Sequence, residues 1–169
     1  MSVGALVLRR LARADASAFR ALRLEGFALE AANFRYAPAD EEHLPPDHFE
    51  TLLDRDFVFG VFDAYRLVGI AGLRAFTDIK TRHKALLYGM YLRAAYRGHG
   101  GADRLMAEIL RAADAHFDIV TLTVMADNAR ARRFYERWGF ELYGVEPASV
   151  KDRGGVCRDE ALMARRRAR

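Results

Sequence analysis

The sequence predicts a single-domain α/β protein with a mixed sheet of about seven strands flanked by four helices. Three observations lead to this prediction. A chain of 169 residues, 51% of them hydrophobic, suits one domain with one apolar core. Short apolar runs alternate with amphipathic stretches along the chain. The strand, helix and strand expected over residues 85–125 require a parallel crossover, which makes the sheet mixed in direction.

The first half of the chain is predicted to hold four strands and two helices. Residues Ala5–Leu11 alternate weakly and indicate a strand, and Asp15 can cap a helix that continues to about Phe27. Three prolines and an acidic cluster between Ala31 and Asp47 predict an exposed loop. The remaining elements are a short helix from Pro46 to about Arg55 and strands over Phe57–Phe62, Leu67–Phe76 and Ala85–Leu92. We expect these last three strands to be antiparallel neighbours.

The second half alternates helices and strands. A helix opens at Gly98–Gly101 and runs to about His116, with its apolar residues on one face. The later elements are a strand over Ile119–Met125, a helix capped by Asp127 or Asn128 and continuing through Trp138, and strands over Phe140–Val145 and Gly155–Met163. We assign the domain to residues 1–164 and expect residues 165–169 to form an arginine-rich tail.

Composition argues against several classes of protein. Cys157 is the single cysteine, so an internal disulfide is excluded, and no CxxC motif or histidine pairing suggests a metal site. No GxSxG motif indicates a serine hydrolase. The N-terminus lacks an apolar run long enough for a signal peptide or a membrane span. We therefore expect a cytoplasmic protein with no metal and no membrane partner.

The net charge of +4 raises the possibility of nucleic-acid binding, since arginines also cluster at the C-terminus. Lysine occurs only three times among the 27 basic residues, and the arginines spread over every expected helix. We therefore favour a solvated basic surface over a nucleic-acid-binding patch. Such a surface would also attract a small anionic ligand.

The stretch Arg97–Ala102 lies between an expected strand and an expected helix. Glycines at a helix start let several backbone N–H groups approach one anion, and Arg97 and the helix dipole add positive potential. This pattern indicates a pyrophosphate-binding loop; a flexible glycine turn is the alternative. The Gly-Lys-Ser/Thr of a P-loop is absent.

Two segments, Leu87–Leu110 and Val124–Gly144, together resemble the GCN5-related N-acetyltransferase (GNAT) family. The family's first signature is an Arg or Gln, two residues, a Gly, one residue and a Gly or Ala. Its second is an Asn early in a helix, then Phe-Tyr, then Gly-Phe opening a strand. The matching residues are Arg97, Gly100 and Ala102 for the first signature and Asn128, Phe134, Tyr135, Gly139 and Phe140 for the second. The expected order of elements also agrees with this family's splayed mixed sheet, although the first 80 residues match only loosely.

The resemblance implies that acetyl-CoA is the cofactor, with coenzyme A as product. It implies that backbone groups of Tyr91 and Leu92 pair with the pantetheine arm, that Asn128 contacts this arm, and that the Tyr135 hydroxyl lies near the thioester sulfur. The backbone amides expected to hold the pyrophosphate are those of Gly98, His99, Gly100, Gly101 and Ala102. Arg97 adds positive charge beside them.

The implied reaction moves an acetyl group to an amine by direct transfer in a ternary complex, because no residue is an obvious covalent acyl carrier. Tyr135 can supply a proton to the leaving thiolate. The base is open: relatives often carry a carboxylate on the cofactor-binding strand, but Ala85–Leu92 has none, which leaves Tyr88, water or Glu30. Of these we select Glu30.

The acceptor is expected to be a small-molecule or peptide amine. Its pocket could be lined by aromatic residues of the first third of the chain, or these could be core residues; they are Phe27, Phe34 and Tyr36. A non-catalytic acyl-CoA-binding or regulatory module, in which Tyr135 would be dispensable, is the alternative function. The last strand and the tail could also support a homodimer.

Overall fold

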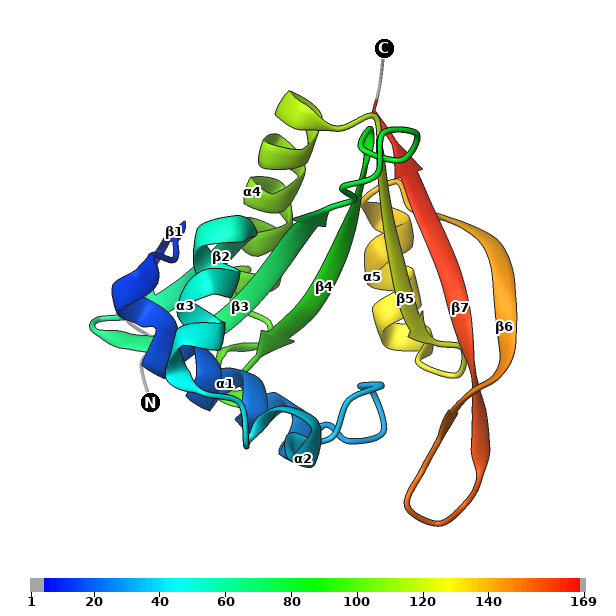
Figure 1. Cartoon of the computed structure of the whole chain (residues 1–169), viewed down its shortest axis with the longest axis horizontal. Helices are drawn as coiled ribbons and strands as arrows, with labels where there is room; N and C mark the ends of the chain where they lie inside the picture. Colours follow the sequence, from blue (N-terminus) through cyan, green and yellow to red (C-terminus); the bar gives the residue numbers. More distant parts are fainter. Residues whose placement is uncertain (1–4, 168–169) are drawn as a thin grey trace.

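The computed structural model describes residues 5–167, which form a seven-stranded mixed sheet with helices on both faces (Figure 1). The strands are β1 (Leu6–Arg10), β2 (Phe57–Asp63), β3 (Arg66–Ala75), β4 (Lys84–Leu92), β5 (Ile119–Met125), β6 (Glu141–Lys151) and β7 (Cys157–Arg166), in the sheet order β1-β2-β3-β4-β5-β7-β6. The helices are α1 (Ala16–Leu29), α2 (Pro38–Glu41), α3 (Pro46–Arg55), α4 (Gly101–His116) and α5 (Ala129–Arg137), with 3₁₀ turns at Arg13–Asp15 and Ala94–Tyr96. The predicted α/β class, the single mixed sheet and its seven strands are confirmed.

Strands β1 to β4 form an antiparallel half-sheet, as expected for β2, β3 and β4. The β2–β3 turn is tight, and Ala64 adopts a positive φ of 51° there. Between β3 and β4 the register shifts at Ile70 and Gly72, opposite Gly89, which has a φ of 63°. This irregularity bends β4 at its midpoint.

The parallel crossover predicted between residues 85 and 125 is present. Strands β4 and β5 pair in parallel from Lys84 to Leu86, and within the described residues the ladder ends there. Figure 1 shows the two strands separating beyond this point, with α5 in the gap between them in that view. The second half of β4 therefore has one edge that is not paired with another strand.

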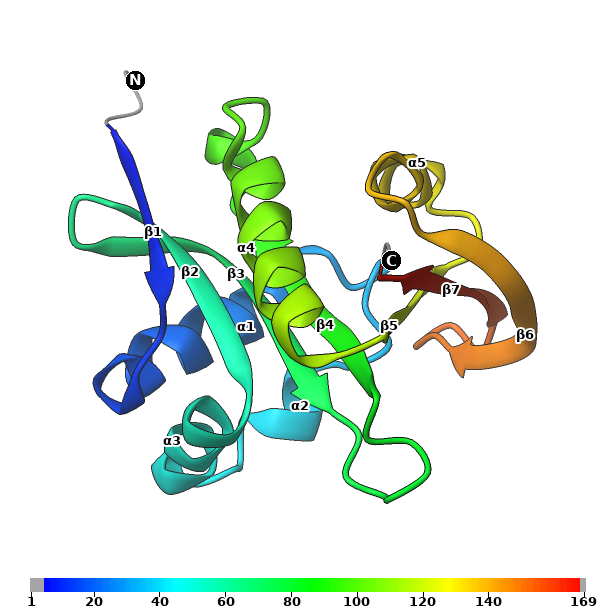
Figure 2. The same ribbon diagram turned by 90° about the horizontal axis from the view of Figure 1, so that it is seen from above.

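Two hydrophobic cores lie on opposite faces of the sheet. Helices α1 and α3 pack on one face around Phe19, Leu22 and Phe49. Helices α4 and α5 lie on the other face, as Figure 2 shows, where α4 buries Leu105, Met106, Ile109 and Leu110. Leu29, which shares the spacing of the buried α1 residues, is instead 72% exposed because it ends the helix beyond the core.

The segment expected to be an irregular loop contains a helical turn, α2. Pro38 occupies its first turn, where the missing N–H costs nothing, and the Asp40 carboxylate accepts a hydrogen bond from the Ala37 amide at 2.7 Å. Asp15 precedes α1 as expected but does not cap it through its side chain. Its carboxylate instead binds the Arg9 guanidinium and the Ala12 amide.

The C-terminal hairpin is longer than predicted. We expected its first strand to end at Val145, but β6 continues to Lys151 through Pro147. Because β6 is an edge strand, the missing proline N–H breaks no essential ladder bond, and the register shifts between Glu146 and Val150.

Strand β7 continues through Arg166, so it takes in the first two residues expected in the tail. Arg165 forms an ion pair with Asp114 at 2.7 Å, and Arg167 pairs with Asp118 at 2.9 Å. These contacts tie the end of the strand to the end of α4 and to the residue just before β5. Residues 168 and 169 of the expected tail lie outside the described residues.

Candidate active site

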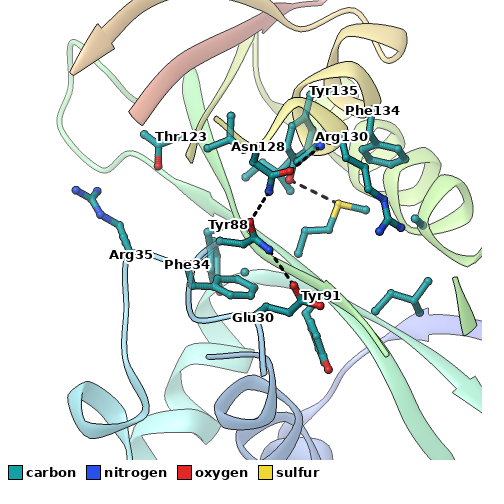
Figure 3. A pocket seen from close by; sticks show the side chains of 18 of the residues that line it. Glu30, Phe34, Arg35, Tyr88, Tyr91, Thr123, Asn128, Arg130, Phe134 and Tyr135 are labelled. Carbon is teal, nitrogen blue, oxygen red and sulfur yellow. Dashed lines mark hydrogen bonds between the residues drawn. The ribbon is translucent and has the colours of Figure 1, made fainter. Parts of the chain in front are cut away.

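A cleft of about 480 Å³ lies where β4 and β5 separate. Its walls come from the end of α1 and the following loop, from β4, from the glycine-rich loop, and from β5, α5 and β7. Figure 3 shows side chains from these elements facing one another across it. Elements far apart in the sequence therefore meet at one site.

Nine of the eleven predicted site residues line this cleft: Glu30, Tyr91, Leu92, Arg97, Gly98, Gly100, Ala102, Asn128 and Tyr135. The other two are not among the lining residues. His99 is exposed at the loop surface, and Gly101 is the buried first residue of α4. A Cβ at Gly101 would lie 3.3 Å from Leu92 Cδ2, so a larger residue there would require the Leu92 side chain to shift.

Two glycines of the glycine-rich loop adopt positive φ angles and have open space beside them. Gly98 and Gly100 adopt φ values of 81° and 76°, and a Cβ at either would meet no atom within 4 Å. The space beside the loop is therefore open. Helix α4 begins at Gly101, and its first backbone N–H groups have no partner within the helix. An anion in this space would meet free N–H donors and the positive end of the helix dipole.

Two hydrogen bonds fix the side chain of Arg97 at the start of this loop. Its Nε donates to the Leu92 carbonyl oxygen at 2.9 Å, and its Nη2 donates to Glu30 Oε1 at 2.6 Å. Glu30 also accepts from Asn33 Nδ2 at 2.8 Å. The hydrogen bond from Arg97 holds the pKa of the Glu30 carboxyl below its ordinary value.

Tyr135 lies on α5 with its hydroxyl directed toward β4, where it makes a long contact of 3.9 Å with Met90 Sδ (Figure 3). Its ring packs edge-on against Phe134 and Phe140. Burial raises the pKa of the Tyr135 hydroxyl to about 12. The hydroxyl is therefore protonated at neutral pH and can donate a proton or a hydrogen bond.

Asn128 performs two structural tasks at the start of α5. Its Oδ1 accepts from the Ala131 amide at 3.1 Å and caps the helix, as one of the two expected caps. Its Nδ2 donates to Asn33 Oδ1 at 3.0 Å. The amide thus reaches across the cleft to the loop after α1.

The far end of the cleft is aromatic and arginine-rich. Phe27 contacts Phe34 and Tyr36 at ring-centroid distances of 5.3 and 6.0 Å. Phe27 is also fully buried, so this group both contributes to the core and lines the cleft. The Tyr88 hydroxyl donates to Asp56 Oδ2 at 2.6 Å, and the Arg74 guanidinium lies 4.7 Å from the centre of the Tyr88 ring.

Asp56 is a buried carboxylate behind this end of the cleft. Burial alone would raise its pKa, but hydrogen bonds from Arg55, Tyr88 and Arg74 outweigh that effect, and the net pKa is lowered. Burial, with the nearby Asp56 charge, raises the pKa of the Tyr88 hydroxyl well above its ordinary value. Tyr88 is therefore held as a neutral hydrogen-bond donor.

Sequence reasoning missed several charged residues of the cleft, among them Glu160 and Arg35. Glu160 lies on β7 with its side chain 2% exposed, and Arg35 lies in the loop after α1. One signal was available: Glu160 stands in a strand whose neighbours Ala161 and Met163 are apolar, and a carboxylate there needs a partner. No local pattern connects it with Arg35, because the two are distant in sequence.

Within residues 5–167, no group of three or more His, Cys, Asp or Glu side chains is arranged to hold a metal ion. In the same part of the chain, no helix is long and apolar enough to cross a membrane.

Comparisons with known proteins agree with the geometry. A family model described as the acetyltransferase (GNAT) family matches residues 24–140. The chain is 32% identical to mycothiol acetyltransferase of Brachybacterium faecium over 132 residues, covering 77% of this chain and 39% of that protein. It is 43% identical to N-alpha-acetyltransferase 40 of Saccharomyces cerevisiae over 105 residues, covering 54% of this chain and 35% of that protein. The chain therefore spans less than half the length of either relative.

Solved structures share the fold over nearly the whole chain. An acetyltransferase of the same family from Streptococcus pneumoniae superposes with a TM-score of 0.85 at 22% identity, covering 95% of this chain and 99% of that one. The yncA protein of Salmonella typhimurium, solved with its cofactor acetyl-CoA, superposes with a TM-score of 0.81 at 15% identity, covering 98% and 95%.

Proposed function

The chain belongs to the acetyltransferase (GNAT) family, and we propose that it transfers an acetyl group from acetyl-CoA to an amine by direct transfer in a ternary complex. One observation carries this proposal. One side of the cleft is lined by the open glycine loop, the unpaired edge of β4 and the Tyr135 hydroxyl. A separate end of the same cleft is aromatic and charged. Donor and acceptor could therefore meet at one place.

The residues of one side of the cleft fit coenzyme A. The space beside Gly98 and Gly100 and the free N–H groups at the start of α4 suit a pyrophosphate. The unpaired edge of β4 near Tyr91 and Leu92 offers backbone groups to an extended chain such as pantetheine. The solved Salmonella neighbour, which contains acetyl-CoA, supports this assignment.

Acetyl-CoA, when bound, supplies the acetyl group as a thioester. The amine nitrogen must lose a proton to attack, and the departing sulfur must gain one. We assign the second proton to Tyr135. Its hydroxyl has a pKa of about 12, so it stays protonated at neutral pH, and it faces β4. The non-catalytic alternative predicts that this hydroxyl is dispensable.

The base stays a prediction. Glu30 lies in the cleft as expected, but the lowered pKa that Arg97 causes makes its carboxylate a weaker proton acceptor. Tyr88 would have to ionise to act as a base, and its raised pKa opposes this. The structure therefore favours water over Tyr88 and leaves Glu30 to be tested directly.

Amine acceptors are supported by the two curated relatives, both of which are named as acetyltransferases, one of them of the N-alpha type. A cytoplasmic location, a homodimer and the absence of a nucleic-acid partner stay predictions.

Calorimetric titration of acetyl-CoA into matched variants tests the proposal. Gly98 and Gly155 both have a φ of 81°, and at both positions an added Cβ would meet no atom within 4 Å, but Gly155 lies in the β6–β7 hairpin. Gly98→Val and Gly155→Val therefore carry the same backbone strain. We expect wild type and Gly155→Val to bind acetyl-CoA with equal affinity and Gly98→Val to lose about tenfold or more, since its side chain fills the anion space.

Turnover is then measured as thiol release with a panel of amines. Saturable binding with turnover supports the enzyme. Binding by wild type with no turnover of any amine would favour the non-catalytic module. No binding by folded wild type would sink the proposal, and affinity for nucleic acid that falls steeply with salt would then support the basic-surface alternative.

A further inference from the structure

An ion pair crosses the cleft at the end away from the glycine loop. Arg35 Nη2 lies 3.2 Å from Glu160 Oε2 and joins the loop after α1 to strand β7. The Glu160 side chain is 2% exposed, whereas the Arg35 side chain is 40% exposed. The Arg35 guanidinium therefore covers the buried carboxylate of Glu160. Because the Arg35 side chain is itself partly exposed, it has room to turn toward solvent.

Glu160 is held in place with one oxygen to spare. The Ser149 hydroxyl donates to Oε2 at 2.6 Å, the same oxygen that Arg35 contacts. Among the described residues, no group donates a hydrogen bond to Oε1. This oxygen is also not completely buried. A buried carboxylate is costly unless a cation pairs with it. A cationic group entering the cleft would find this oxygen free.

The strand register places Glu160 on the same face of the sheet as Thr123. In β5 and β7, Met125 is opposite Glu160 and Thr123 is opposite Leu162, and opposed side chains share a face. Thr123 lines the cleft, and Figure 3 shows it near Arg35 at the end opposite Arg130 and Phe134. Glu160 therefore belongs to the acceptor end and not to the cofactor end.

We propose that the acceptor is a zwitterion, an amine that carries a carboxylate close to its nitrogen, as a free amino acid does. Its ammonium group takes Oε1 of Glu160, and its carboxylate takes the Arg35 guanidinium. This inference rests on the proposed function and names the substrate class of the same cleft. It gives both charges of the pair a partner in the bound state.

The physical reason is the balance of charges. A simple amine would take Oε1 of Glu160 and leave the exposed donors of Arg35 without a new acceptor, and a simple acid would draw Arg35 away and leave Glu160 unpaired. A zwitterion exchanges one ion pair for two. Arg35 is also suited to a carboxylate because its planar guanidinium can donate two parallel hydrogen bonds.

Aromatic side chains beside the Arg35–Glu160 ion pair indicate what kind of side chain the acceptor carries. Phe34 and Tyr36 flank Arg35 in the sequence, and both line the cleft with Phe27. These rings offer an apolar wall to a side chain. The inferred acceptor is therefore an amino acid with an apolar side chain, such as leucine.

Steady-state kinetics with matched acceptors test the inference at saturating acetyl-CoA. Leucine is compared with 3-methylbutylamine, which lacks the carboxylate, and with leucinamide, which keeps the amine but resembles the start of a peptide. The variants are Glu160→Gln, Arg35→Ala and their double mutant. The control variants come from the exposed surface pair of α4, Glu108→Gln and Arg111→Ala. Acetyl-CoA affinity is measured for every variant by calorimetry.

We expect wild type to prefer leucine over both analogues by about 10- to 100-fold in kcat/KM, the value of a charged hydrogen bond. Arg35→Ala should lower kcat/KM for leucine by a similar factor and leave 3-methylbutylamine within about threefold, so the preference disappears. Glu160→Gln should lower kcat/KM for every acceptor. The two effects should be non-additive in the double mutant. Acetyl-CoA affinity and the control variants should be unchanged.

Several outcomes would overturn the inference alone. These are acetyl-CoA binding by wild type with equal use of leucine and leucinamide, an Arg35→Ala variant that keeps the preference, or binding with no turnover of leucine. Failure of wild type to bind acetyl-CoA overturns the proposed function instead, and this inference with it.

Discussion

Asn128 and Asn33 join through one hydrogen bond, from Nδ2 to Oδ1 over 3.0 Å, although they are 95 residues apart in the sequence. The bond spans the cleft from the start of α5 to the loop after α1 (Figure 3). Asn128 is also expected to contact the pantetheine arm, and the second N–H of its Nδ2 can make this contact while the bond to Asn33 is kept. The loop that carries Arg35 is thus linked to the side of the cleft where we propose that the cofactor binds.

Variants of Asn128 separate its capping role from its role in binding. Asn128→Ser keeps an N-cap acceptor and should preserve the free energy of unfolding, whereas Asn128→Ala should lower it by about 1 kcal/mol. Both lack the amide donor, so both should weaken acetyl-CoA binding by about 3- to 10-fold. Chemical denaturation and calorimetry measure the two effects. Wild-type affinity in Asn128→Ser would contradict a contact with the cofactor.

Removing the Tyr135 hydroxyl should slow the chemical step and leave the fold intact. Its one hydroxyl contact among the described residues is the long one to Met90, so Tyr135→Phe should unfold like wild type. We expect kcat to fall by about 10²- to 10³-fold with little change in KM, the usual loss of a general acid. Tyr143→Phe, on the exposed face of β6, is the control. A Tyr135→Phe variant with normal kcat would favour a different proton donor.

The raised pKa of Tyr135 also fixes the alkaline side of the pH profile. With a pKa of about 12, the hydroxyl keeps its proton throughout the range in which an acceptor amine loses its own. The rate should therefore rise with pH as the amine deprotonates and show no decline up to about pH 10.5. An alkaline decline with a midpoint below about pH 10, absent from Tyr135→Phe, would show that this hydroxyl ionises earlier.

Glu30→Gln tests the predicted base. A role as base predicts a loss of kcat of about 10²-fold or more and a change in the acid limb of the pH profile. A role in holding Arg97 at 2.6 Å predicts weaker acetyl-CoA binding with kcat nearly unchanged. Because Arg97 lowers the pKa of Glu30, we expect the second result. Kinetics over a pH series, with calorimetry of the same variant, distinguish the two.

Asp56 should contribute stability that is lost in acid. Its folded-state pKa is lowered, so its contribution is present above the unfolded pKa of about 3.9 and disappears as pH falls through the folded value. Asp56→Asn leaves Arg74 and Tyr88 without their anion and should cost about 3 kcal/mol at neutral pH. The difference between wild type and variant should shrink below about pH 4. Asp54→Asn, on the exposed side of α3, serves as the control.

Most of the fold could be predicted because its signals are local. The apolar runs of β2 to β5 and the amphipathic face of α4 placed the boundaries within a few residues. The errors arose where neighbours in space override a local signal. Pro147 indicates the end of a strand, but as part of an edge strand it is tolerated in β6. Asp15 favours a helix cap, but Arg9 takes its carboxylate.

The amino-acid sequence alone was enough to predict the α/β class, the glycine turn before α4 and most of the motif residues that line the cleft, because each depends on residues close together in the chain. The pairing of charges in the cleft follows only from the tertiary structure. It joins Arg97 to Glu30 and Arg35 to Glu160. These pairings depend on the separation of β4 from β5 and on the path of the loop after α1. No spacing in the sequence encodes the distance between two segments that meet only after the sheet has formed.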